Sequence, residues 1–228
     1  MQLNILVEGQ TEEMFVKEIL APYLQVRGIY ATPIIVSTKI MRDGIKFRGG
    51  LTNGNFNQFI GDLKKLINST PNGMVSTFLD YYGLPSVFPN YSDRVEFAEP
   101  LKRVKFLENS LKEYLSSPKN FLPYIQLHEF EAFLFAHPKG FEQNLERNEA
   151  NLDGLKEIIN SHQNPEDINE GTDTSPSKRI LSHYPGYDKV LEGNMMLNDI
   201  GLETLLEKCP HFNEWITNVI HFKSQSDT

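Results

Sequence analysis

Four short apolar runs mark the first half of the chain, and each has the length of a buried strand. They occupy residues 3–7, 30–36, 75–79 and 121–127. Turn-forming or polar residues follow each run, which is typical of strands that end at the edge of a sheet. We therefore expect four strands, and the last should be interrupted early because Pro123 has no amide hydrogen to donate.

Helical patterns lie between and after these runs. They cover residues 11–27, 56–67 and 95–115, and residues 128–135 have a helical composition. We expect Thr11 to cap the first helix and a proline near its middle to kink it. The order β-α-β-α-β-α-β-α predicts an α/β fold in which helices cover both faces of a mostly parallel sheet.

The pattern changes after residue 140. Helical segments are expected at 141–161, at 202–209 and again after Pro210, whereas the polar stretch 164–179 should form an ordered loop. The expected organisation has an α/β domain over 1–140, a helical C-terminal part over 141–222 and a flexible tail over 223–228. One continuous domain is the alternative for the first two parts.

Composition narrows the class of protein. The 228 residues are 39% hydrophobic and 23% charged, so a packed core is expected. No apolar run approaches the ~20 residues of a membrane span, and the first residues lack the order of a signal peptide. The single cysteine, Cys209, excludes an internal disulfide and a cysteine-based zinc cluster. These features predict a cytoplasmic protein with no membrane partner.

The formal net charge of −8 argues against a general nucleic-acid coat protein, because phosphate neutralisation needs a basic surface. It does not exclude a nuclease, since metal-binding carboxylates add to the negative total. Arg48 belongs to a local basic cluster in residues 39–55, a stretch that is rich in glycine and asparagine and is expected to form a long loop. A solvated surface is the alternative interpretation of that cluster.

Acidic residues follow two of the expected strands. Glu8 comes directly after the first strand and Asp80 after the third. Right-handed crossovers would bring both to one edge of the sheet, together with His128 and Glu129 after the fourth strand. Carboxylates are suitable ligands for a hard cation such as Mg²⁺. The sequence therefore predicts a metal site at this edge, although an aspartate after a strand also serves to start a turn.

Neighbouring residues have competing interpretations. Glu12 lies one turn into the first helix and is a further metal candidate, whereas Glu13 is expected only to stabilise the helix dipole. Tyr81 and Tyr82 either stack on a base or sugar or act as buried aromatic anchors.

Three protonatable residues lie where the fourth strand gives way to a helix. His128, Glu129 and Glu131 are flanked by phenylalanines and leucine, so at least one should be buried beside a partner. His128 is a candidate metal ligand or proton carrier, and a structural role is its alternative. A zinc-protease motif is rejected because its second histidine is absent from the segment.

Basic residues later in the chain are candidates for binding phosphate. Pro176 and Ser177 are expected to open a helix, whose N-terminus favours anions, and Lys178 and Arg179 follow directly. Lys189 is a further candidate. Ordinary surface charge is the alternative for all three basic residues.

Five motifs spread over nearly the whole chain form a specific combination. They are Val7-Glu8-Gly9-Gln10-Thr11-Glu12, Asp80-Tyr81-Tyr82-Gly83-Leu84-Pro85, His128-Glu129-Phe130-Glu131-Ala132, Pro176-Ser177-Lys178-Arg179, and Cys209-Pro210-His211-Phe212 with Trp215. Together they resemble the DUF4276 family. That family is similar to a branch of the TOPRIM superfamily that is related to the nuclease domains of OLD-type proteins.

The resemblance implies a compact Rossmann-like, TOPRIM-like sheet and cleavage of RNA or DNA that depends on Mg²⁺ or Mn²⁺. It assigns acid–base chemistry or metal binding to Glu8, metal binding to Asp80, and the second acid of the Glu-Gly-x-Thr-Glu pattern to Glu12. Related proteins resemble effectors encoded beside an ABC-type ATPase in anti-phage defence, where the effector cleaves RNA such as tRNA. A homodimer is also compatible with such a nuclease.

The chain departs from the Asp-x-Asp pattern that is usual in TOPRIM proteins, because Tyr81 and Tyr82 follow Asp80 and the second aspartate is absent. Glu129 or Glu131 is our candidate for the missing carboxylate, with the other available for proton transfer. The rival hypothesis is a catalytically silent regulatory or binding subunit of the ATPase complex, which the missing aspartate and the negative charge favour. A nucleotide-binding protein is disfavoured because the sequence has no glycine-rich phosphate loop.

Overall fold

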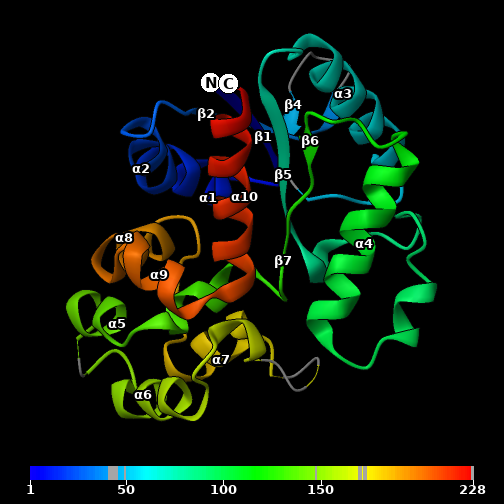
Figure 1. The fold of residues 1–228 in the computed structure, drawn as a ribbon. Coiled ribbons are helices and arrows are strands. Elements are labelled where there is room, and N and C mark those ends of the chain that lie inside the picture. Colours follow the sequence, from blue (N-terminus) through cyan, green and yellow to red (C-terminus); the bar gives the residue numbers. More distant parts are fainter. Residues whose placement is uncertain (41–45, 49, 147, 169–170, 172–173, 227–228) are drawn as a thin grey trace. The chain divides into compact units, whose positions relative to one another are not determined.

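The computed structural model describes residues 1–40, 46–48, 50–146, 148–168, 171 and 174–226 (Figure 1). Contacts divide the chain into two compact units. The first contains Met1–Gln126 with Asn218–Thr228, and the second contains Leu127–Thr217. The sequence places this boundary fourteen positions later, at residue 140, because the residues after 127 continue the apolar character of the sheet region.

The first unit is built on a parallel sheet, as the alternation of strands and helices predicts. Every pairing in this sheet is parallel among the described residues, and the strand order is β2-β1-β5-β6, with β7 also pairing with β5. The strands are β1 (Gln2–Val7), β2 (Tyr30–Ile35), β5 (Met74–Asp80), β6 (Phe121–Leu122) and β7 (Ile125–Gln126).

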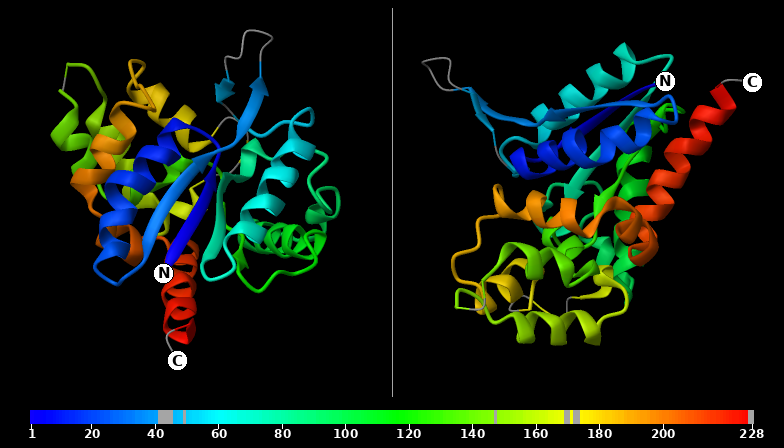
Figure 2. Two further views of the ribbon diagram at one scale, coloured as in Figure 1. Left: turned by 90° about the horizontal axis from the view of Figure 1, so that it is seen from above. Right: turned by 90° about the vertical axis from the view of Figure 1, so that its left-hand side faces the viewer.

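Helices cover both faces of this sheet (Figure 2). The chain order places α1 and α2 on one face and α3 and α4 on the other, as expected for right-handed crossovers from β1 outward in two directions. These helices are α1 (Gln10–Phe15), the π-helical turn Val16–Leu20, α2 (Ala21–Gln25), α3 (Phe56–Ser69) and α4 (Pro100–Tyr114), with 3-10 turns at Tyr81–Gly83 and Asp93–Glu96.

The first helical segment differs from the prediction in two details. Gly9, not Thr11, is the N-cap of α1. The helix runs without interruption from residue 10 to residue 25, and Pro22 stands at the second position of α2, behind the π-helical turn. The wider π-helical turn accommodates the proline, whose missing amide hydrogen would otherwise leave a gap in the helical ladder.

The prediction of a long loop at residues 39–55 is wrong for part of that range. β3 (Ser37–Ile40) and β4 (Lys46–Arg48) pair as antiparallel strands. The abundance of glycine and basic residues hid the short polar–apolar alternation that allows this pairing. Residues 41–45 and 49 are outside the described part of the chain.

The fourth predicted strand is split by Pro123, as the sequence indicates. After the break, a side chain of β5 replaces the missing ladder contacts. Thr77 Oγ1 donates to the carbonyl of Tyr124 and accepts from its amide, both at 3.0 Å. The threonine hydroxyl, fully buried, therefore keeps the strand in place beyond the proline.

The second unit is helical around an aromatic core. Residues 128–135, expected to be helical, instead form an extended start and the 3-10 turn Phe130–Ala136, all seven of whose residues are buried. The helices are α5 (Lys139–Asn144), α6 (Leu152–Ser161), the 3-10 turn Pro165–Asp167, α7 (Pro176–His183), α8 (Glu192–Ile200) and α9 (Leu202–Lys208).

The last helix, α10 (Pro210–Ser226), begins in the second unit, and its residues from Asn218 onward belong to the first. The flexible tail expected at 223–228 is therefore helical through residue 226, and residues 227–228 are outside the described part. In the described residues, no helix combines the length and the apolar character that crossing a membrane requires.

Candidate functional site

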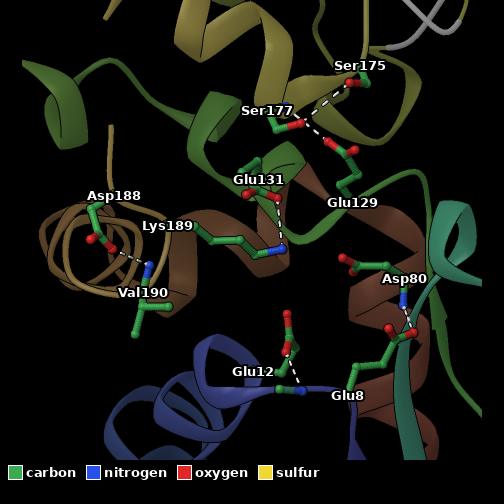
Figure 3. Close-up of polar contacts among 11 residues, drawn as sticks. Glu8, Glu12, Asp80, Glu129, Glu131, Ser175, Ser177, Asp188, Lys189 and Val190 are labelled. Carbon is green, nitrogen blue, oxygen red and sulfur yellow. Dashed lines mark hydrogen bonds and ion pairs between the residues drawn. The ribbon is translucent and has the colours of Figure 1, made fainter. Parts of the chain in front are cut away.

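Two acidic residues lie together where β1 and β5 end. Val7, the last residue of β1, pairs with Phe78 of β5, so Glu8 emerges beside the final residue of β5, Asp80. Glu8 Oε1 accepts a hydrogen bond of 3.0 Å from the backbone N–H of Asp80 (Figure 3). Residues 72 positions apart in the sequence are thus joined at the carboxyl edge of the sheet, where ligands bind in parallel α/β folds.

Glycines leave room for the Glu8 carboxylate. A Cβ atom at Gly83 would lie 3.0 Å from Glu8 Oε2 and 3.2 Å from Oε1, and one at Gly50 would lie 3.8 Å from Oε2. A side chain at position 83 would therefore crowd the carboxylate and require it to shift. The turn after β5 therefore helps to determine where the carboxylate of Glu8 points.

Glu12 has a structural task at the same edge. Its Oε2 accepts a hydrogen bond of 2.9 Å from the backbone N–H of Gly9, which forms the capping box of α1. The residue is buried, with 4% of its surface exposed. Its neighbour Glu13 instead forms an ion pair of 2.7 Å with Lys17 one turn along the helix, in agreement with the helix-stabilising role expected for it.

The carboxylates at this edge of the sheet suit one particular way of binding magnesium. Among the residues that the structure describes, no three histidine, cysteine, aspartate or glutamate side chains form a group arranged to hold a metal ion. Magnesium, however, is commonly held by one or two carboxylates, and water and substrate phosphates complete its shell. Glu8 and Asp80 fit that mode, and Glu12, which also caps the helix, stays a further candidate.

Two aromatic rings follow Asp80 directly. The rings of Tyr81 and Tyr82 have centroids 5.7 Å apart, and neither residue is buried. Tyr82 is 43% exposed. The alternative of buried anchors is therefore wrong for both rings.

The second unit holds an ion pair whose acidic partner is buried. The Glu131 side chain is 3% exposed, and its Oε2 lies 3.2 Å from Lys189 Nζ (Figure 3). Burial raises the pKa of the Glu131 carboxyl, while the positive charge of Lys189 acts in the opposite direction. The same ammonium lies 5.7 Å from the centre of the Phe130 ring. Lys189, a candidate for binding phosphate, is thus the internal partner of Glu131.

A carboxylate also lies at the helix start that the sequence assigns to phosphate. Glu129 Oε2 accepts a hydrogen bond of 3.0 Å from the backbone N–H of Ser177, in the first turn of α7. Arg179 turns back on its own segment, since its Nε donates to the carbonyl of Thr174 at 2.8 Å. Lys178 is exposed. The anion that stabilises the start of α7 is therefore Glu129 itself.

His128 is held in a strained and buried position. Its backbone has φ of 63°, and only 2% of the residue is exposed. Burial lowers the pKa of the imidazole, which a hydrogen bond to the backbone of Glu166 and the charges of Asp167 and Glu129 only partly oppose. The ring is therefore maintained in its neutral form.

Glu166 is a structural residue that the sequence analysis missed. Its two carboxylate oxygens accept hydrogen bonds from the backbone N–H groups of His211, at 2.8 Å, and Phe212, at 3.1 Å. These donors belong to the first turn of α10, and burial raises the pKa of the carboxyl. No local pattern signals this contact, because 45 residues separate Glu166 from the helix that it caps.

The candidate residues thus fall into separate groups. In the first unit, the structure joins Glu8 with Asp80 and places Glu12 at the start of the next helix. His128, Glu129, Glu131, Lys178, Arg179 and Lys189 belong to the second unit. Arg48 ends β4, and its side chain is outside the described part of the chain.

One comparison with known proteins gives a match. The family model DUF4276, a domain of unknown function, matches residues 7–220. No curated protein and no solved structure matches the chain.

Proposed function

The chain belongs to the DUF4276 family, and we propose that it is a nuclease that hydrolyses phosphodiester bonds of RNA or DNA with Mg²⁺ or Mn²⁺. The observation that carries the proposal is the pair formed by Glu8 and Asp80 at the carboxyl edge of a parallel sheet. Two adjacent carboxylates, one held by a backbone amide, suit a divalent cation that also contacts a substrate phosphate.

The side chains have distinct tasks in this proposal. Asp80 and Glu8 would hold the cation, and the amide of Asp80 keeps Glu8 oriented. A cation bound there would polarise a phosphoryl oxygen and lower the pKa of attacking water. Glu12 would be a further ligand of the cation, and its bond to Gly9 fixes the turn between β1 and α1 that carries Glu8.

The second unit contains the other residues of the proposal. Glu129 or Glu131 is proposed for proton transfer, and Lys178 and Arg179 are proposed for contacts with phosphates. We also propose that the first unit is a TOPRIM-like, Rossmann-like domain, on the basis of an acid after β1 and an aspartate that ends β5. An anti-phage effector role, with an ABC-type ATPase as partner, extends the same proposal.

A second function is favoured by a specific observation. Tyr81 and Tyr82 follow Asp80, so the second acid of an Asp-x-Asp pattern is absent, and the described residues contain no group of three metal-ligating side chains. A catalytically silent subunit that uses the same edge to dock on its ATPase would have these properties. It would bind its partner without cleaving nucleic acid.

The two functions are separated by a cleavage assay on the whole chain. Labelled single- and double-stranded RNA and DNA are incubated with Mg²⁺, Mn²⁺ or a chelator. We expect cleavage that the chelator abolishes and that falls about 100-fold or more in Glu8→Gln and Asp80→Asn, because each loses charge at the metal. The matched control is Glu13→Gln, in which the same chemical change removes only a surface ion pair.

Two outcomes would reject the nuclease. One is cleavage by Glu8→Gln and Asp80→Asn at the wild-type rate. The other is the lack of cleavage on every substrate combined with a melting temperature that Mg²⁺ leaves unchanged, because a ligand that binds the folded state must raise it. The second outcome would favour the silent subunit.

A further inference from the structure

A cavity of about 270 Å³ lies in the first unit, at the sheet edge opposite the carboxylates. It is lined by Met74 and Phe121, the first residues of β5 and β6, and by residues of the last turns of α10. Asp80 is at the other end of β5, roughly 20 Å away at ~3.3 Å per residue. The cavity is therefore separate from the proposed metal site.

The polar lining of this cavity is basic. Lys112, Lys119 and His221 face it, and the amide side chains of Asn218 and Gln225 complete its polar lining. No aspartate or glutamate is among the described residues that line it. Two lysines and a histidine therefore share one hollow.

These lysines have no acidic partner within the described part of the chain. Neither Lys112 nor Lys119 takes part in any of its ion pairs. Lys112 also complements the C-terminal dipole of α4, but Lys119 lies beyond that helix, so the dipole does not explain it.

Size and lining define the class of ligand. A volume of 270 Å³ is slightly below the ~300–1,000 Å³ of typical small-molecule sites, so a compact ligand fits better than a polymer. Lysines, a histidine and amides are donors that suit phosphate oxygens, and the ring of Phe222 supplies an apolar wall. We propose that this cavity binds the phosphate group of a small phosphorylated ligand, such as a nucleoside monophosphate.

The proposal does not rest on nuclease activity, and it is tested by binding alone. Calorimetric titrations of the whole chain at constant ionic strength use inorganic phosphate, adenosine 5′-monophosphate and adenosine. We expect the monophosphate to bind and adenosine to bind at least tenfold more weakly, because the lysines recognise the phosphate. Lys112→Gln with Lys119→Gln should weaken monophosphate binding about tenfold or more.

Control variants distinguish a site from general attraction. Lys139→Gln removes one positive charge from an exposed position in the other unit and should leave binding unchanged, and Lys119→Arg should retain it. Thermal melting checks that each variant is folded. A 5′-phosphorylated trinucleotide, compared with its 5′-hydroxyl form, tells whether the phosphate belongs to a free nucleotide or to a nucleic-acid end.

Three results would overturn the proposal. They are equal affinity for adenosine and its monophosphate, unchanged binding by the folded double variant, and the lack of binding by the wild-type protein. Cleavage measured under the same conditions reports on the Glu8 site independently, so the two proposals fail separately.

Discussion

At the scale of single residues, the position of the Glu8 carboxylate depends on a glycine. Gly83 follows β5 in a turn whose backbone needs no left-handed conformation, so alanine is acceptable to the backbone. Its Cβ would nevertheless lie 3.0 Å from Glu8 Oε2, and one of the two groups must move.

We therefore expect Gly83→Ala to reduce nucleic-acid cleavage at least about tenfold, because small displacements of catalytic groups have large effects on rate. The free energy of unfolding should change by less than about 1 kcal/mol, since the flexible carboxylate yields first. The matched control is Gly61→Ala in α3, where the new Cβ meets nothing within 4 Å. Equal cleavage by the two variants would contradict this role of Gly83.

His128 gives a second prediction at this scale. Burial lowers the pKa of its imidazole below the ordinary value of 6.5, so the folded protein disfavours the proton that the unfolded chain accepts. The stability that His128 contributes is present above pH 6.5 and is lost as the pH falls through the lowered pKa. The raised pKa values of Glu131 and Glu166 act in the opposite sense.

We expect the wild type to lose more stability between pH 7.5 and pH 5.5 than His128→Asn, because asparagine tolerates the left-handed backbone but does not titrate. Urea unfolding at the two pH values measures the difference, in which the contributions of the glutamates cancel. Between pH 8.5 and 7.5, where the imidazole is neutral in both states, the two proteins should differ by a constant. An identical loss in both proteins between pH 7.5 and 5.5 would rule out His128 as the cause.

At the scale of elements, two helices begin at a carboxylate from elsewhere in the sequence. Glu129 bonds to the first turn of α7 and Glu166 to the first turn of α10, whereas Glu12 caps its own helix. A buried helix start leaves amide hydrogens that need acceptors, and an acidic side chain also favours the positive end of the helix dipole. These contacts attach loops to the helices that they cap.

The cap of α10 is testable by stability. Glu166→Ala would leave two buried amides without an acceptor, so the free energy of unfolding should fall by about 2–4 kcal/mol at neutral pH. Chemical denaturation measures the change. Glu207→Ala is the control, because its side chain is 72% exposed and its loss should cost less than about 0.5 kcal/mol. Similar values for both variants would show that Glu166 does not hold the helix.

The elements also show which sequence patterns are informative. The strands at residues 3–7, 30–36 and 75–79 were predicted to within two residues, because buried parallel strands are nearly continuous apolar runs. The β3–β4 pair was missed, since its composition resembles a loop. The 3-10 turn Phe130–Ala136 was expected to be an ordinary helix, because composition does not separate the two helix types.

At the scale of the whole molecule, the two units are not consecutive segments of the chain. The first unit takes both the first 126 residues and the last turns of α10. A division into consecutive domains was expected because the polar–apolar pattern is local and contains no information on where a distant helix packs. Because the end of α10 belongs to the first unit, it lines the proposed phosphate cavity together with the first residues of β5 and β6.

The sequence by itself determined the class of fold and one edge of the sheet. Parallel strands expose their carboxyl ends together, so an acid after each of two adjacent strands had to meet, and Glu8 and Asp80 do. Tertiary structure alone decided the partners of the other charged residues: Lys189 pairs with Glu131, and Glu129 and Glu166 cap helices far along the chain. The hydrophobic periodicity of a sequence indicates which residues are buried. The partners of a charged residue instead depend on packing between segments that are distant in sequence.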